Sequence, residues 1–137
     1  REYEYIILNR VAPPVLEKNK VWYLRSKLDT TLMKKAAKKL LGTHNFNAFR
    51  SANCQANSPI RTLKKLKIVN KEEKIIFILR SKSFLKNQVR SIVGCLKYIG
   101  ENKWTINDLE KLLKSKKRKN CAPPAPAHGL YLSKIIY

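Results

Sequence analysis

The sequence has few of the residues on which most catalytic sites depend. Its 137 residues include nine Asp and Glu, two His and four Gly. So few glycines leave no loop able to cradle phosphates in the manner of the P-loop or dinucleotide-binding motifs. The acidic residues, from Glu2 to Glu110, fall in expected strands, turns and helix caps, where solvation or capping explains them. Composition alone therefore predicts a module without an obvious catalytic group of its own.

Cysteine and histidine are also scarce, and they stand far apart. The cysteines form no C-x-x-C pair, and together with the histidines they show no metal-ligand spacing: Cys54, Cys95, Cys121, His44 and His128. We therefore expect no metal site. An odd number of unpaired cysteines is typical of a reducing compartment, so the sequence predicts a cytoplasmic protein.

Long apolar runs are absent as well. None approaches the roughly 20 residues that a membrane span needs, and no signal-peptide pattern opens the chain. Peripheral membrane binding needs a basic amphipathic helix with exposed large apolar residues, whereas the best helical stripe here is better explained as core. We therefore expect no membrane partner. The chain begins at Arg1, directly in a strand-like run, and we expect it to be a piece of something longer.

Positive charge is what the sequence has in excess. Thirty Lys and Arg against nine Asp and Glu give a formal net charge of +21. Self-repulsion of this size in a small domain favours a polyanionic partner, and nucleic acid is the usual one. The alternative is that an A/T-rich genome inflates lysine and leaves the excess as a solvated face.

Hydrophobic periodicity predicts the element order β-α-β-β-α-α-β. The expected strands cover 3–8, 65–68, 75–79 and 130–137, and the expected helices cover 29 or 30 to 41, 85–99 and 105–113. Gly42 is expected to stop the first helix, and Thr105-x-x-Asp108 to open the last as a capping box. We expect an α/β domain of the α+β type, with a mixed, mostly antiparallel sheet and helices packed on one face.

The stretch from Thr43 to Arg61 has no clean period and is predicted to be a long functional loop. Arg50 and Arg61 can hold phosphates, and three amides suit sugar or base edges: Asn53, Gln55 and Asn57. Phe46 and Phe49 could stack on bases, but their spacing favours the core. His44 has no acidic neighbour and is interpreted as a hydrogen-bonded loop residue.

Arg90 follows the apolar Val89 in the helix with the strongest pattern. It is either a plain surface arginine or a group at the rim of a cleft, where it would pair with a carboxylate from another segment. The periodicity leaves both interpretations open.

Five sequence blocks, in order along the whole chain, resemble the TruA-type tRNA pseudouridine synthases. They are R-x-Y-x-Y-x-I from Arg1, A-A-x-x-L-x-G from Ala36 followed by H-x-F-x-x-F-R from His44, C-Q-x-x-S-P-x-R-T from Cys54, F-L-x-x-x-V-R-x-I-V-G from Phe84, and A-P-A-x-G-L-x-L from Ala125. Three positions depart from the usual family residues. Asn45 replaces Asp, Gln88 replaces Met and Ser91 replaces Asn.

The resemblance implies that residues 1–137 are the C-terminal domain of an enzyme that isomerises uridine to pseudouridine in the tRNA anticodon arm. Such enzymes use no metal or cofactor, and they work as homodimers in which one tRNA touches both subunits. Their nucleophile is an aspartate in a G-R-T-D-A-G motif of the N-terminal domain, and this sequence has no such motif. The chain alone would therefore be inactive.

The resemblance also assigns roles to residues. Tyr3 is the tyrosine that packs on the target base, and Arg90 is the arginine that pairs with the missing aspartate. The residues implied to contact tRNA, besides Tyr3, are Arg50, Asn53, Cys54, Gln55, Ala56, Asn57 and Arg61. The rival hypothesis is a non-catalytic basic RNA-binding module, such as a ribosome-associated protein.

Overall fold

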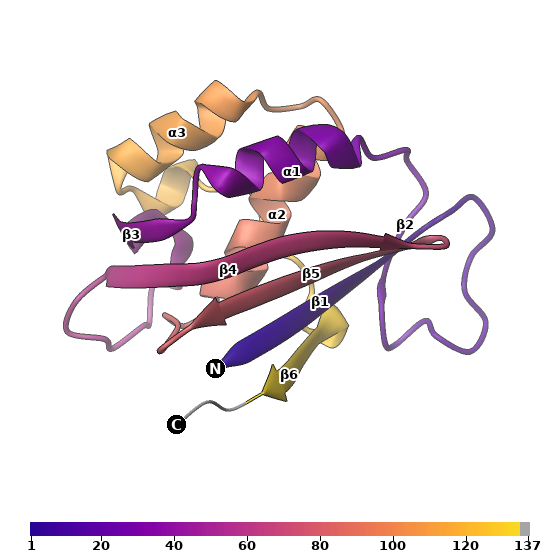
Figure 1. The fold of residues 1–137 in the computed structure, drawn as a ribbon, viewed down its shortest axis with the longest axis horizontal. Coiled ribbons are helices and arrows are strands. Elements are labelled where there is room, and N and C mark those ends of the chain that lie inside the picture. The colour runs from indigo at the N-terminus through magenta and orange to yellow at the C-terminus, as the bar shows by residue number, and fades with distance from the viewer. Residues whose placement is uncertain (135–137) are drawn as a thin grey trace.

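The computed structural model describes residues 1–134, which form a six-stranded sheet and three α-helices (Figure 1). In chain order these elements are β1 (Glu2–Asn9), β2 (Trp22–Leu24), α1 (Thr30–Lys38), β3 (Gly42–Asn45), β4 (Ile60–Lys71), β5 (Lys74–Ser81), α2 (Gln88–Gly100), α3 (Ile106–Ser115) and β6 (Leu130–Lys134). Short 3-10 helices cover Asn47–Phe49, Arg118–Asn120 and Ala127–Gly129. The last three residues of the expected strand 130–137 lie outside the described residues.

The sheet is mixed and mostly antiparallel, as predicted. Its strand order is β2-β1-β5-β4-β3, and β6 also pairs with β1. Among the strand pairings of residues 1–134, only β1–β2 is parallel. On one edge of β1, β6 pairs with residues 2–5 and β2 pairs with residues 7–9, so both ends of the described chain meet on this strand.

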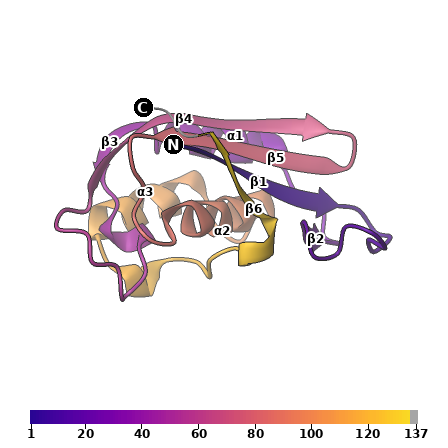
Figure 2. The same cartoon turned by 90° about the horizontal axis from the view of Figure 1, so that it is seen from below.

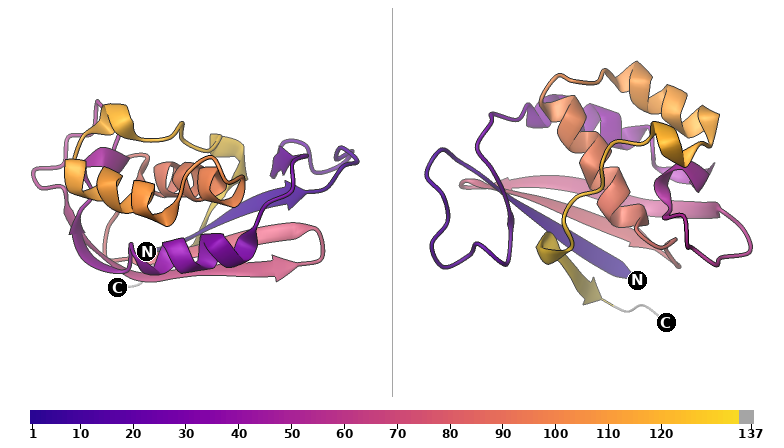
Figure 3. Two further views of the ribbon diagram at one scale, coloured as in Figure 1. Left: turned by 90° about the horizontal axis from the view of Figure 1, so that it is seen from above. Right: turned by 180° about the vertical axis from the view of Figure 1, so that it is seen from behind.

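α2 and α3 lie to one side of the sheet, as predicted for the helices, whereas α1 lies along the edge of the sheet (Figures 2 and 3). α2 crosses one face, α3 lies beyond it, and α1 follows the β4 edge and packs against α2 (Figures 2 and 3). Within the described part of the chain, no helix covers the opposite face. Burial alternates along β5, where Ile75, Phe77 and Leu79 point into the core and the residues between them are partly exposed. This alternation is what a sheet covered on one face requires.

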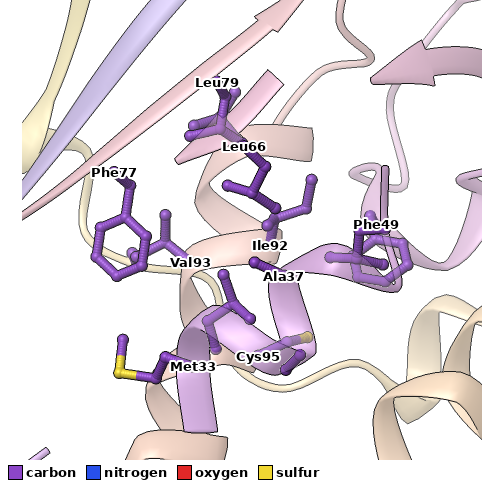
Figure 4. Packing of buried hydrophobic residues seen from close by; sticks show 14 of the residues in the cluster. Met33, Ala37, Phe49, Leu66, Phe77, Leu79, Ile92, Val93 and Cys95 are labelled. Atoms are coloured by element: carbon purple, nitrogen blue, oxygen red, sulfur yellow. The ribbon is translucent and has the colours of Figure 1, made fainter. Parts of the chain in front are cut away.

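The core lies between the sheet and α2 (Figure 4). The apolar stripe predicted for the strongest helix is buried throughout, at 4% exposure or less: Leu85, Val89, Ile92, Val93, Leu96 and Ile99. The capping box of α3 is confirmed, because Thr105 Oγ1 accepts from the Asp108 N–H at 3.2 Å and Asp108 Oδ2 accepts from the Thr105 N–H at 2.8 Å. Phe46 and Phe49 are fully buried, so their assignment to the core is confirmed as well.

Several predicted boundaries are wrong. α1 ends at Lys38 rather than Leu41, and Leu41 is 38% exposed. Gly42 has a φ of +94° and starts β3 instead of stopping the helix directly. α2 begins at Gln88, since the preceding residue, Asn87, has a left-handed backbone with a φ of 66° that cannot continue a helix.

The stretch 43–61 is more ordered than its sequence indicates. It contains β3, a 3-10 helix and the start of β4. Polar residues form β3 because they find partners across the sheet, as where the Thr43 and Thr62 hydroxyls lie 2.7 Å apart opposite each other. β2 was also missed, since it is three residues long and depends on parallel pairing with β1.

One carboxylate does not fit the predicted solvated or capping role. Glu2 is 8% exposed, and its Oε1 accepts from Arg80 Nη2 at 2.9 Å and lies 3.7 Å from Lys65 Nζ. These cations from β4 and β5 replace the water that a surface carboxylate would bind.

Candidate functional site

Tyr3 and Arg90 line the same open cavity, although 87 positions separate them in the sequence. The cavity has a volume of about 340 Å³, within the range usual for small-ligand sites. Its walls come from the start of β1, the connection from β5 to α2, the first turn of α2, and the start of β6; they include Phe84, Asn87 and Leu130. The sheet and the helix thus bring together the two residues that the sequence blocks assigned to catalysis.

Tyr3 points to the helix side of the sheet, where it is opposite Leu79 of β5 and Leu132 of β6. Its ring meets the Phe84 ring edge to face, with centroids 5.5 Å apart and planes at 78°. This arrangement is one of the two favoured for aromatic pairs, and it fixes the tilt of the tyrosine ring in the cavity.

Arg90 projects from the first turn of α2, and its guanidinium is held by two acceptors. Nε donates to the Ala125 carbonyl at 2.7 Å, and Nη1 donates to Asn87 Oδ1 at 3.1 Å. In the described part of the chain, no carboxylate lies within ion-pair distance of this guanidinium. Of the two interpretations left open by periodicity, the structure supports the group at a cavity rim.

The Ala125 carbonyl belongs to residues 121–126, here called the strap, which run along α2 toward β6 (Figure 3). The strap is fixed to α2 by a second hydrogen bond, from the Ala125 N–H to the Arg90 carbonyl at 2.9 Å. The carbonyl of Pro126, the last residue of the strap, accepts a hydrogen bond from the buried Tyr5 hydroxyl at 2.5 Å. Burial raises the pKa of Tyr5.

Gly94 allows the strap to come this close. A Cβ at this position would lie 2.1 Å from the Pro123 carbonyl oxygen, well inside van der Waals contact. The glycine in the block that begins at Phe84 therefore has a structural reason, because only glycine lets α2 and the strap touch.

The loop from Arg50 to Arg61 lies beside the cavity. The Ser51 N–H donates to the carbonyl of Lys86, which itself lines the cavity, at 3.0 Å. Both predicted phosphate-binding arginines also hold the loop together. Arg50 Nη1 donates to the Ala56 carbonyl at 3.4 Å, and Arg61 Nη1 donates to the Ser58 carbonyl at 2.7 Å.

The amide side chains of this loop face solvent. Asn53, Gln55 and Asn57 are all exposed, and Asn53 Oδ1 accepts from the Ser51 hydroxyl at 2.7 Å. Within residues 1–134, neither Gln55 nor Asn57 makes a side-chain hydrogen bond, so the full hydrogen-bonding capacity of both amides is open to a ligand. Cys54, which follows Asn53 in the sequence, is half-buried, and backbone N–H groups of Ala56 and Lys86 that donate to its sulfur lower the pKa of its thiol.

The departures at positions 45 and 88 have local explanations. Asn45 Oδ1 accepts from the Asn47 N–H at 2.9 Å, a role that needs an oxygen but no charge. Gln88 is 1% exposed, and its Oε1 accepts from the Leu85 N–H at 2.8 Å. His44 Nε2–H donates to the Leu41 carbonyl at 2.8 Å, which confirms a hydrogen-bonded role, although His44 lies in β3 rather than in a loop.

Sequence reasoning missed two groups of the site. In the sequence, Asn87 is only an unspecified position of the block that begins at Phe84, and Ala125 is only the first residue of the last block. The signal for Asn87 is its type, since Asn tolerates a left-handed backbone better than most residues. No sequence signal identifies Ala125, because it acts through its carbonyl.

Comparison with known proteins decides the family. A family model described as tRNA pseudouridine synthase matches residues 36–137. The chain belongs to this family. It is 54% identical over all its 137 residues to a tRNA pseudouridine synthase A of Pelagibacter ubique (strain HTCC1062), 47% to one of Bartonella tribocorum and 43% to one of Rhodospirillum centenum. It covers 56% of each of these three relatives, so it spans about half the length of the curated relatives it matches.

Within residues 1–134, no helix is long and apolar enough to cross a bilayer. No group of three or more His, Cys, Asp or Glu residues comes together there in an arrangement suited to a metal ion.

Proposed function

We propose that residues 1–137 are the C-terminal domain of an enzyme that isomerises uridine to pseudouridine in the anticodon arm of tRNA. The observation that carries this proposal is the cavity in which Tyr3 and Arg90 meet, with a fixed guanidinium that has no carboxylate beside it among the described residues. An aspartate from the N-terminal domain of the same polypeptide, the family's nucleophile, is the group that this cation would receive.

Each residue of the cavity then has a defined role. The guanidinium of Arg90 binds and orients the carboxylate through parallel N–H donors, a geometry that planar arginine provides. The ring of Tyr3, tilted by its contact with Phe84, packs on the uracil once the nucleotide has left the stack. The reaction breaks the N–C glycosidic bond and forms a C–C bond to the same ribose, which needs no metal or cofactor.

The basic surface and the loop 50–61 supply the affinity for tRNA. The net charge of +21 attracts the phosphate backbone, and the open amides beside the cavity suit sugar and base edges. The family resemblance supports a homodimer with one tRNA touching both subunits, and a cytoplasmic location. No observation in the structure favours the rival non-catalytic RNA-binding module.

Replacing both Gln55 and Asn57 with alanine in the complete enzyme should weaken tRNA binding and leave the fold intact. Both side chains are exposed and make no internal hydrogen bond in the described structure. Each substitution should therefore weaken tRNA binding by about 1 kcal/mol and leave the free energy of unfolding unchanged. Filter binding and thermal unfolding measure the two effects. Asn107→Ala, an exposed amide on α3, is the control and should change neither. A lower melting temperature with unchanged tRNA affinity would show that the loop amides are structural.

A further inference from the structure

Asn87 occupies the N-cap position of α2 but does not cap the helix. An asparagine there normally accepts a hydrogen bond from the backbone N–H of the second or third helical residue. The third helical residue here is Arg90, and Asn87 Oδ1 instead accepts from its guanidinium Nη1 at 3.1 Å. The Asn87 side chain therefore restrains the Arg90 side chain instead of capping the start of α2.

The turn before α2 holds Asn87 in place for this contact. Leu85 and Gln88, on either side of it, exchange two hydrogen bonds: the Leu85 N–H donates to Gln88 Oε1 at 2.8 Å, and the Gln88 N–H donates to the Leu85 carbonyl at 3.0 Å. Both residues are buried, at 3% and 1% exposure. The left-handed backbone of Asn87, with a φ of 66° and ψ of 4°, is therefore fixed by its neighbours.

The two acceptors on Arg90 come from different elements and restrain different nitrogens. The Ala125 carbonyl of the strap takes the Nε donor, and Asn87 takes one donor of Nη1. A guanidinium has five N–H donors in one plane. Those that remain are both donors of Nη2 and one of Nη1, and charge-assisted hydrogen bonds from such donors are what a carboxylate accepts.

We propose that Asn87 is a positioning residue, which fixes the plane of the Arg90 guanidinium so that its remaining donors meet the nucleophilic carboxylate. With the Ala125 bond alone, the group can still turn about the bonds of its side chain. The Asn87 bond adds a second fixed nitrogen, and the two nitrogens together with the covalent link to Cδ define the plane of the guanidinium. This inference rests on the proposed function, since the carboxylate comes from the N-terminal domain.

The test is Asn87→Gly in the complete enzyme. Glycine accepts the positive φ and is tolerated at an N-cap, so the fold should keep its stability within a few tenths of a kcal/mol. The single-turnover rate of pseudouridine formation should fall about tenfold, because the nucleophile is less well placed, while tRNA affinity stays unchanged. Asn102→Gly is the matched control, because Asn102 also has a positive φ, of 62°, but lies beyond the far end of α2. The single-turnover rate of the Asn102→Gly enzyme should equal that of wild type.

A double-mutant cycle separates positioning from a general structural role. If Asn87 acts only through Arg90, Asn87→Gly should cause no further loss of rate in an Arg90→Ala background. A wild-type rate for Asn87→Gly alone, or an additional tenfold loss on top of Arg90→Ala, would overturn the inference. A wild-type rate for Arg90→Ala would instead reject the proposed function, so the two failures are distinguishable.

Discussion

Arg90→Ala in the complete enzyme should lower the single-turnover rate of pseudouridine formation about a hundredfold or more. Removing the guanidinium leaves the nucleophilic carboxylate buried without its partner, and breaking such a pair typically costs about 3–5 kcal/mol locally. A displacement of the nucleophile by about 1 Å alone lowers a rate roughly a hundredfold. Affinity for tRNA should change little, because Arg90 lines a cavity, two of its donors are held by Ala125 and Asn87, and the proposal assigns the others to the carboxylate.

Arg90→Lys should also be slow. Lysine keeps the charge but loses the planar fork that reaches Ala125, Asn87 and the carboxylate together. Arg118→Ala, in the exposed basic run after α3, is the control and should leave the single-turnover rate unchanged. Near-wild-type rates for both Arg90 variants would contradict the assignment of Arg90 to the active site.

Gly94→Ala should destabilise the domain and slow the reaction at once. The new methyl group would lie 2.1 Å from the Pro123 carbonyl oxygen, so α2 and the strap must separate. Overpacking of this kind costs about 1–3 kcal/mol, which more than offsets the gain of up to about 1 kcal/mol that alanine brings to a helix interior. Because the strap carries the Ala125 carbonyl, its displacement also removes an acceptor from Arg90.

Gly100→Ala provides the comparison on the same helix. Its Cβ would meet the Met33 sulfur at 2.6 Å, the end of a flexible side chain that can move. Thermal unfolding of both variants should therefore show the larger loss for Gly94→Ala, and single-turnover kinetics should show a loss of rate for Gly94→Ala alone. A stability and a rate for Gly94→Ala equal to those of wild type would mean that the strap does not hold Arg90.

The parts of the fold that follow from local patterns could be predicted from the sequence. The buried stripe that ends in α2 and the capping box of α3 depend on residues at most 14 positions apart, and both are confirmed. β3 could not be predicted, because its polar residues become a strand only by pairing with β4. The burial of Glu2 was missed for the same reason, since the cations that bind it lie on β4 and β5.

The residues of the candidate site also divide into those that the local sequence indicates and those that depend on distant contacts. The sequence blocks assign Tyr3 and Arg90 to the site by resemblance, whereas periodicity alone leaves Arg90 either on the surface or at a cleft. The hydrogen bond from Arg90 to the Ala125 carbonyl holds the guanidinium at the cavity. Ala125 lies 35 residues after Arg90, and no side chain in the sequence indicates a role that belongs to a backbone carbonyl. Asn87 was within reach of local reasoning, since it lies three positions before Arg90, but its left-handed backbone is set by the buried turn around it.

The most direct test of the half-enzyme proposal compares residues 1–137 with the complete enzyme, measuring bound tRNA and pseudouridine formed per tRNA. The chain alone should bind tRNA with an affinity that falls with salt, by a log–log slope of roughly 0.7–0.9 for each phosphate neutralised. It should form no pseudouridine, because it lacks the nucleophile, whereas the complete enzyme should convert its target uridines. Pseudouridine formed by residues 1–137 alone, or none formed by the complete enzyme, would contradict the account.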